Sequence, residues 1–359
     1  MPNKERPLLG VQQKIDLGKI DRSAIARLMC FLICIGVLTA AFAVSGVWKD
    51  GRQWFGNHGV QLESEDATSW EEDASPSVPP SSADTNKKED INEEIPIGAI
   101  PVVSLDLSCD WRSQNVLENQ TAHRLNLAEL LTMPISWQDV GDEPMVLILH
   151  THATEAYMSP DTSYIVGTVG DSIYSDLESR SVVAVGKALC DTLNQNGIPS
   201  VHCSQKHGKD GTLQNAYASS EACVKAYLKK YPSIQYVIDL HRDGILDQSG
   251  ALVRTETQSQ EDGYCQVMLV VGSDGNGTEC PNWKENLALA LQLCARLDGS
   301  VEGMCRTVSL RNASYNQELA PHSLLLEIGS AGNTQEEAIR TVRLLGEELS
   351  CLIKESISS

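Results

Sequence analysis

Three short apolar runs each lead to a side chain that can bind a metal or move a proton. Residues 146–149 lead to His152, residues 236–240 to His241, and residues 324–326 to Glu327. Short apolar runs bounded by polar residues are typical of buried strands in a parallel sheet. The carboxyl ends of such strands meet at one sheet edge, where active sites of α/β proteins form. The sequence therefore predicts a metal centre at this edge.

Glu155 extends this prediction because it follows His152 by three residues, a spacing that places both side chains on one side of a turn. With His241 they would supply the three protein ligands of a catalytic zinc site, which keeps its fourth position for water. Glu178, at the start of the next expected helix, is an alternative acidic ligand. Glu327 would act as the general base, its pKa raised by partial burial. A structural ion pair with an arginine is the alternative role for Glu327.

Residues beside these candidates have several possible roles. We expect His150 to face away from His152 and to support the site or pack, and not to bind the metal. Arg242 and Asp243 could orient His241 or neutralise substrate charge, and both interpretations stay open. Three further histidines fall in expected loops, where they would be solvated: His202, His207 and His322.

Strands and helices alternate from residue 145 onward. Strands are predicted at 146–149, from 199, and at 236–240, 264–272 and 324–328, and helices at 179–196, 213–230, 282–297 and 334–354. This alternation predicts a single three-layer α/β domain over residues 145–357, with a mainly parallel sheet flanked by helices. Residues 95–144 form a lead-in segment, with a short helix expected within 115–133. No glycine-rich phosphate-binding motif occurs, so we predict no nucleotide ligand.

The N-terminal part has a different composition. Residues 28–48 contain no charged residue and are long enough to cross a hydrocarbon core of ~30 Å as a helix. The basic segment 1–27 would then stay cytoplasmic, which predicts a single-pass cell-membrane protein with an extracytoplasmic catalytic domain. A cleaved signal peptide is the alternative. Residues 49–94 are acidic and rich in Ser and Pro, which predicts a disordered tether.

The chain as a whole is acidic and contains cysteines without a recognisable pattern. The net charge of −20 argues against binding to nucleic acid, which rewards basic surfaces. Eleven cysteines are present, two of them inside the expected membrane span, with no CxxC pair and no regular disulfide framework. We infer a compartment that does not enforce disulfide formation.

Four blocks of sequence resemble the signature blocks of the sporulation stage II protein P family. They are LHTHATEAY (149–157), VIDLHRDG (237–244), SYNQELAP (314–321) and LLLEIGSAGNTQEEA (324–338), in the family's order across residues 145–357. The resemblance implies a domain like that of the zinc-dependent N-acetylmuramoyl-L-alanine amidases. It implies that His152 and His241 bind the metal and that Glu327 is the catalytic acid. The acidic ligand is either Glu155, our choice, or Glu178, nearer the general amidase pattern. Three residues resemble ones that line the family's cleft: Tyr315, Asn316 and Gln317.

The same resemblance implies a membrane-anchored peptidoglycan hydrolase. It would cleave the amide between N-acetylmuramic acid and the stem-peptide L-alanine, with cleavage of peptide cross-links as a further activity. The implied role is septal wall thinning and engulfment during sporulation, with the sporulation stage II protein D as partner. One alternative is a zinc carboxypeptidase, for which Arg242 or Arg311 would bind the free carboxylate. Another is a non-enzymatic wall-binding scaffold, which is disfavoured because no cysteine lies beside His152 or His241 to close a structural zinc site.

Overall fold

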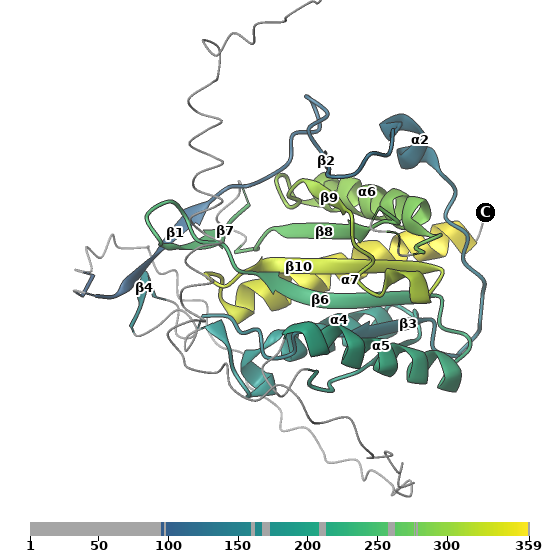
Figure 1. Ribbon diagram of the computed structural model, residues 1–359, viewed down its shortest axis with the longest axis horizontal. Coiled ribbons are helices and arrows are strands. Elements are labelled where there is room, and N and C mark those ends of the chain that lie inside the picture. Colours follow the sequence, from purple (N-terminus) through teal and green to yellow (C-terminus); the bar gives the residue numbers. More distant parts are fainter. Residues whose placement is uncertain are drawn as a thin grey trace, which may run out of the picture. The chain divides into compact units, whose positions relative to one another are not determined.

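A seven-stranded sheet forms the centre of the protein, and its strands lie side by side in Figure 1 in the order β2-β9-β8-β10-β6-β3-β5. The computed structural model describes residues 95–357, except 97, 159–161, 167–172, 208–212, 258–262, 276 and 278. One set of strands is mutually parallel: β3 (Val146–Leu149), β5 (Ser200–His202), β6 (Tyr236–Asp243) and β10 (His322–Ser330). A second parallel set runs the other way and joins the first where β8 pairs with β10: β2 (Leu117–Asn119), β8 (Val267–Gly272) and β9 (Val308–Arg311). The predicted, mainly parallel sheet is therefore mixed at one pairing.

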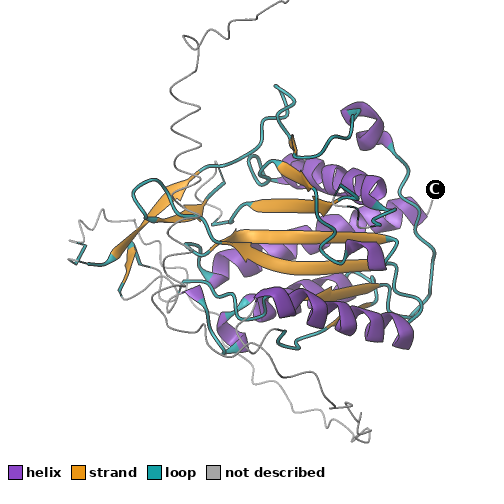
Figure 2. Cartoon of the chain, in the orientation of Figure 1, coloured by secondary structure: helices purple, strands orange, loops and turns teal. Residues whose placement is uncertain are grey.

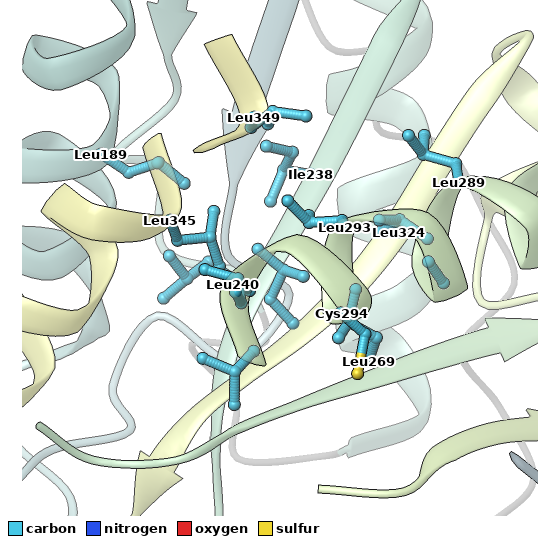
Figure 3. Close-up of a cluster of buried hydrophobic side chains, with 14 of the residues drawn as sticks. Leu189, Ile238, Leu240, Leu269, Leu289, Leu293, Cys294, Leu324, Leu345 and Leu349 are labelled. Atoms are coloured by element: carbon cyan, nitrogen blue, oxygen red, sulfur yellow. The ribbon is translucent and has the colours of Figure 1, made fainter. Parts of the chain in front are cut away.

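Helices cover both faces of this sheet, which gives the predicted three-layer α/β architecture (Figure 2). On one face, leucines of three helices pack against Ile238 and Leu240 of β6 (Figure 3). These helices are α4 (Val182–Gln195), α6 (Trp283–Ser300) and α7 (Gln335–Ile357). On the other face, α5 (Leu213–Lys230) contributes Val224 to a smaller cluster with Val237 of β6. Strand β6 is buried on both faces, which explains its continuous apolar run.

A small second sheet pairs strands from distant parts of the chain. Its order is β4 (Tyr164–Ile165), β1 (Ile100–Leu105) and β7 (Leu252–Thr255), with β1 antiparallel to β4 and parallel to β7. Ile100 and Val102 pack against a buried cluster that includes Met158. This sheet ties the segment before the main sheet to the loops that follow β3 and β6.

The expected helix within residues 115–133 is only partly present. Helix α2 spans Leu127–Thr132. Asn126 caps its N-terminus, where the Asn126 side chain accepts a hydrogen bond from the Glu129 N–H. Pro134 disfavours helical backbone at Met133, which is extended. Leu117–Asn119 forms strand β2 instead, because β9 offers it a parallel partner. Pairing with a distant strand therefore overrides the local helical pattern.

The expected single-pass membrane location is corrected by the structure. In the part of the chain that the structure describes, no helix combines the length and the apolar character needed to cross a membrane. Its longest helix, α7, carries Glu336, Glu337 and Lys354 near its ends and has only one apolar face. The expected tail 1–27, span 28–48 and tether 49–94 lie outside the described residues.

Candidate metal centre

Strand β6 and the turn after β3 bring two predicted histidines together. The chain leaves β3 at Leu149 and turns through residues 151–154, which places the ring centre of His152 5.2 Å from that of His241. Two imidazoles on one tetrahedral zinc ion would have their ring centres about 5 Å apart. His241 is only 3% exposed, whereas His152 is partly exposed. The pair thus has the spacing of a shared metal site that opens at the His152 side.

Glu155 lies beside His241. Its Oε2 atom is 3.3 Å from Nδ1 of His241 and accepts a hydrogen bond of 3.1 Å from the backbone N–H of Arg242. Two donor atoms on one tetrahedral zinc ion are also about 3.3 Å apart. Burial raises the pKa of Glu155, but the charge and hydrogen bond of His241 outweigh it and leave the pKa lowered. Glu178 is exposed in the short turn Glu178–Arg180, so of the two acidic alternatives only Glu155 adjoins His241.

Asp239 completes the surroundings of His241 and was not singled out from the sequence. Its Oδ1 atom lies 2.9 Å from Nε2 of His241, although that nitrogen makes no hydrogen bond in the described structure. Thr151 donates to Asp239 from its backbone N–H at 2.8 Å and from its hydroxyl at 2.6 Å. The sequence did contain a signal for Asp239, because a residue two positions before His241 lies on the same face of the strand.

The electrostatics of this group favour a positive charge at His241. Burial lowers the pKa of His241, but the carboxylates of Asp239 and Glu155 outweigh it and raise the pKa well above its ordinary value. Burial raises the pKa of Asp239. The charge of His241 and the hydrogen bonds from Thr151 outweigh this effect and lower the pKa to about 2. A buried imidazole between two carboxylates fits a divalent cation as well as a proton.

Glu327 lies opposite His241 in the register of β10 and β6. Its Oε2 atom is buried and has no hydrogen-bond partner among the described residues. Burial, with smaller contributions from the negative charges of Glu155 and Asp243, raises the pKa of Glu327 to about 8. An acid that titrates near neutral pH is suited to accept and return a proton.

His152 is the least closely held of the candidates. The ligand atoms of His152, Glu155 and His241 do not all lie within 4.8 Å of one another, so the His152 ring must turn to complete a triad. Tyr217 of α5 packs edge-on against this ring at 5.9 Å between ring centres, and sequence reasoning did not find it. Burial lowers the pKa of His152, with His241 as a smaller cause, which favours the neutral imidazole that binds metals.

His150 lies away from this group, within the α4 side of the sheet. Its Nδ1 atom is 2.8 Å from the carbonyl oxygen of Leu240, and its Nε2 atom is 2.9 Å from Nε2 of His202. Burial, followed by the charge of His202, lowers the pKa of His150 to about 3. The expectation of a solvated His202 was wrong, because this last residue of β5 packs against Gly186 of α4 and hydrogen-bonds to His150.

Arg242 and Asp243 hold loops in place. The guanidinium of Arg242 is buried, donates to the carbonyl oxygens of Ala156 and Ile173, and lies over the ring of Tyr174. It thereby fixes the segment that carries Glu155. Asp243 accepts a hydrogen bond of 2.9 Å from Arg306.

The expected cleft residues 315–317 lie beside Asp239. Tyr315, Asn316 and Gln317 line a small pocket together with Asp239 and Ser220. Asn316 donates to the hydroxyl of Ser220 at 3.1 Å, which attaches this loop to α5. Gln317 is buried, accepts from the Gly272 N–H and donates to the Val270 carbonyl, so it fixes the loop to β8.

A model of the family "Stage II sporulation protein P" matches residues 59–350. The chain belongs to this family. The resemblance of the four sequence blocks is thereby confirmed. Stage II sporulation protein P of Bacillus subtilis (strain 168) is 30% identical over 230 residues, which cover 59% of this chain and 52% of that protein. The chain thus spans about half the length of this curated relative.

Several solved structures also resemble this stage II sporulation protein P chain. The N-acetylmuramyl-L-alanine amidase Ami1 from Mycobacterium smegmatis is 11% identical, with a TM-score of 0.35 over 60% of this chain and 99% of that one. The CwlD amidase from Clostridioides difficile, solved in complex with the GerS lipoprotein, is 13% identical, with a TM-score of 0.33 over 60% and 98%. At these scores the likeness supports no statement about activity.

Proposed function

We propose that this chain is a zinc-dependent N-acetylmuramoyl-L-alanine amidase, which cleaves the amide between N-acetylmuramic acid and the stem-peptide L-alanine of peptidoglycan during sporulation. The observation that carries the proposal is the buried imidazole of His241. Glu155 lies 3.3 Å from it, the ring centre of His152 lies 5.2 Å from its own, and Glu327 is its neighbour in register. Membership of the stage II sporulation protein P family supports the role in sporulation.

His152, Glu155 and His241 would hold the Zn²⁺. When bound, such an ion polarises the scissile carbonyl and lowers the pKa of water toward ~7. Glu327 accepts the proton of the attacking water at Oε2 and delivers it to the departing amide nitrogen. With a pKa of about 8, Glu327 can both hold and release this proton near neutral pH. The Oδ1 atom of Asp239 lies 2.9 Å from the other nitrogen of His241, where it would accept the N–H of an imidazole whose Nδ1 atom binds the ion.

A zinc carboxypeptidase is the less favoured function, because it needs an arginine that reaches a free carboxylate. The guanidinium of Arg242 is buried and donates to carbonyl oxygens of the chain. Arg311 donates from Nε to the hydroxyl of Ser309 at 3.0 Å. Cleavage of peptide cross-links and action with the sporulation stage II protein D stay predictions from the family resemblance.

The test is digestion of purified peptidoglycan by the full chain, with mass spectrometry of the products. We expect stem peptides with a free N-terminal L-alanine, loss of activity in a chelator, and recovery on addition of Zn²⁺. Products shortened at the peptide C-terminus would instead identify a carboxypeptidase. His241→Ala should lower the zinc content of the chain. His123→Ala, which alters a histidine outside this centre, is the control and should not lower it. Equal zinc content in both variants would contradict the ligand assignment.

A further inference from the structure

A second group of metal-binding side chains lies between β5 and α5. Cys203 directly follows β5, Cys223 lies within α5, and His207 lies in the segment that connects them. All three side chains are buried, and the two sulfur atoms are 3.0 Å apart. Over the described ranges, this is the group of three Cys, His, Asp or Glu side chains whose ligand atoms all lie within 4.8 Å of one another.

His207 provides the observation that points to a ligand. The sequence suggested a solvated loop histidine, but the side chain is only 5% exposed. Its Nδ1 atom lies 2.9 Å from the hydroxyl oxygen of Ser219, whereas Nε2 is buried and has no hydrogen-bond partner in the described structure. If Nδ1–H donates to Ser219, the lone pair is on Nε2. Histidines that bind metals commonly donate their other ring N–H to an oxygen in this way.

The two sulfur atoms are farther apart than in a disulfide and closer together than two thiolates on one zinc ion. A disulfide requires about 2.05 Å between sulfur atoms. Two thiolates on one tetrahedral zinc ion are about 3.8 Å apart, since each Zn–S bond is about 2.3 Å. At the observed 3.0 Å the two sulfur atoms are not bonded, and both cysteines are free. A disulfide would leave the buried His207 nitrogen without a partner, whereas a metal ion would bind all three groups.

We propose that Cys203, His207 and Cys223 form a second, structural Zn²⁺ site. Thiolate sulfur and imidazole nitrogen are ligands that zinc prefers at such sites, and these three residues would supply three of its four positions. Zinc binds thiolates, so binding at neutral pH releases the proton of each thiol to solvent. The site is independent of the proposed amidase activity, because it shares no ligand with the first centre.

The role of this site follows from what it connects. The backbone N–H of Cys203 donates to the Ile148 carbonyl of β3 at 2.8 Å, so the β5 end is fixed to the sheet. Helix α5 carries Ser220, whose hydroxyl oxygen lies 2.9 Å from that of Thr151, and Tyr217, which packs against His152. A metal ion that joins Cys203 to Cys223 would therefore hold α5 against the turn of the first centre.

The experiment is metal analysis of the full chain by mass spectrometry after equilibration with Zn²⁺ and removal of free metal. In a His241→Ala background we expect one zinc per chain to remain. Adding Cys223→Ser should remove it, whereas adding Cys190→Ser, a matched buried thiol on α4, should not. With Co²⁺ in place of zinc, His241→Ala should keep a sulfur-to-cobalt charge-transfer absorption that Cys203→Ser and Cys223→Ser lack.

Two outcomes would overturn the proposal. One is a folded His241→Ala chain, by circular dichroism, that retains no zinc. The other is an intact mass lower by two hydrogens, located by peptide mapping to Cys203 and Cys223, which would show a disulfide. His207→Gln keeps both thiols and should weaken zinc binding at least tenfold, so the proposal stays testable if a cysteine variant fails to fold. Failure of the amidase proposal would be a separate result: the His241→Ala substitution would then leave the zinc content of the chain unchanged.

Discussion

Glu327 and His241 are adjacent in register, but their surroundings set their charges in opposite ways. Burial raises the pKa of Glu327 to about 8, and its Oε2 atom has no hydrogen-bond partner in the described structure. His241 is also buried, yet the carboxylates of Asp239 and Glu155 raise its pKa and favour a positive charge on its imidazole. In the proposed site a proton carrier therefore lies beside the cation, and the two roles can be separated by mutation.

We predict that Glu327→Gln keeps the zinc content of the chain and lowers turnover on peptidoglycan by about 10²- to 10⁴-fold, the usual contribution of a general acid–base. The amide has nearly the shape of the carboxyl group but cannot accept the proton. Glu302→Gln, at an exposed position, serves as the control. Loss of zinc from a folded Glu327→Gln chain would show instead that Glu327 is a ligand.

A second residue-scale prediction concerns His150. Its pKa in the folded chain is about 3, against an ordinary value of 6.5, chiefly because of burial. In the unfolded chain the His150 imidazole therefore binds a proton near pH 6.5, whereas in the folded chain it does not. The free energy of unfolding falls as the pH decreases below this value. Between about pH 6 and about pH 4 this group adds a slope of up to about 1.4 kcal/mol per pH unit.

His150→Gln should remove this slope while keeping an N–H that can donate to the Leu240 carbonyl. Urea unfolding at several pH values, in a chelator so that metal binding does not contribute, measures the slope directly. Equal slopes in wild type and His150→Gln would show that His150 can be protonated in the folded chain.

At the scale of elements, the sequence predicts long periodic segments well and short paired ones poorly. The helix expected at 213–230 has the same bounds as α5, because its pattern and its ends are local properties. Strand β4 has two residues and β2 has three, and each exists only because a distant strand pairs with it. For the same reason the site was predicted from His152, His241 and Glu327 at strand ends, whereas Tyr217 depends on how α5 packs.

The packing of α4 against His150 gives a prediction at this scale. A methyl group at Gly186 would overlap the ring of His150, lying 2.5 Å from its Nε2 atom. We expect Gly186→Ala to lower the free energy of unfolding by about 1–3 kcal/mol, as overpacking of a core does. Gly299→Ala on α6 is the matched control, because its methyl group would meet nothing within 4 Å and should stabilise the helix by up to ~1 kcal/mol. Urea unfolding measures both, and equal effects would mean that α4 can move away from β3.

At the scale of the whole molecule, β1 connects the N-terminal side of the folded part to loops near the site. Four of its residues, Val102 to Leu105, pair in parallel register with β7, and Ile100 packs on the cluster that includes Met158. Met158 in turn donates its backbone N–H to the Asn333 carbonyl at 2.9 Å, which joins the loop carrying Glu155 to the end of β10. The small sheet therefore fixes the loop that supplies one proposed zinc ligand.

We predict that urea unfolding distinguishes two shortened chains, one that begins at residue 95 and keeps β1, and one that begins at residue 107 and lacks it. A chain beginning at residue 107 should lose on the order of 2–3 kcal/mol, from the aliphatic burial and strand pairing of β1. It should also bind zinc at the first centre more weakly, since Glu155 is then less firmly held, while thiolate–cobalt absorption from Cys203 and Cys223 persists. Equal stability of the two shortened chains would show that β1 contributes nothing to the fold and that the segment after His152 is held from within the main domain.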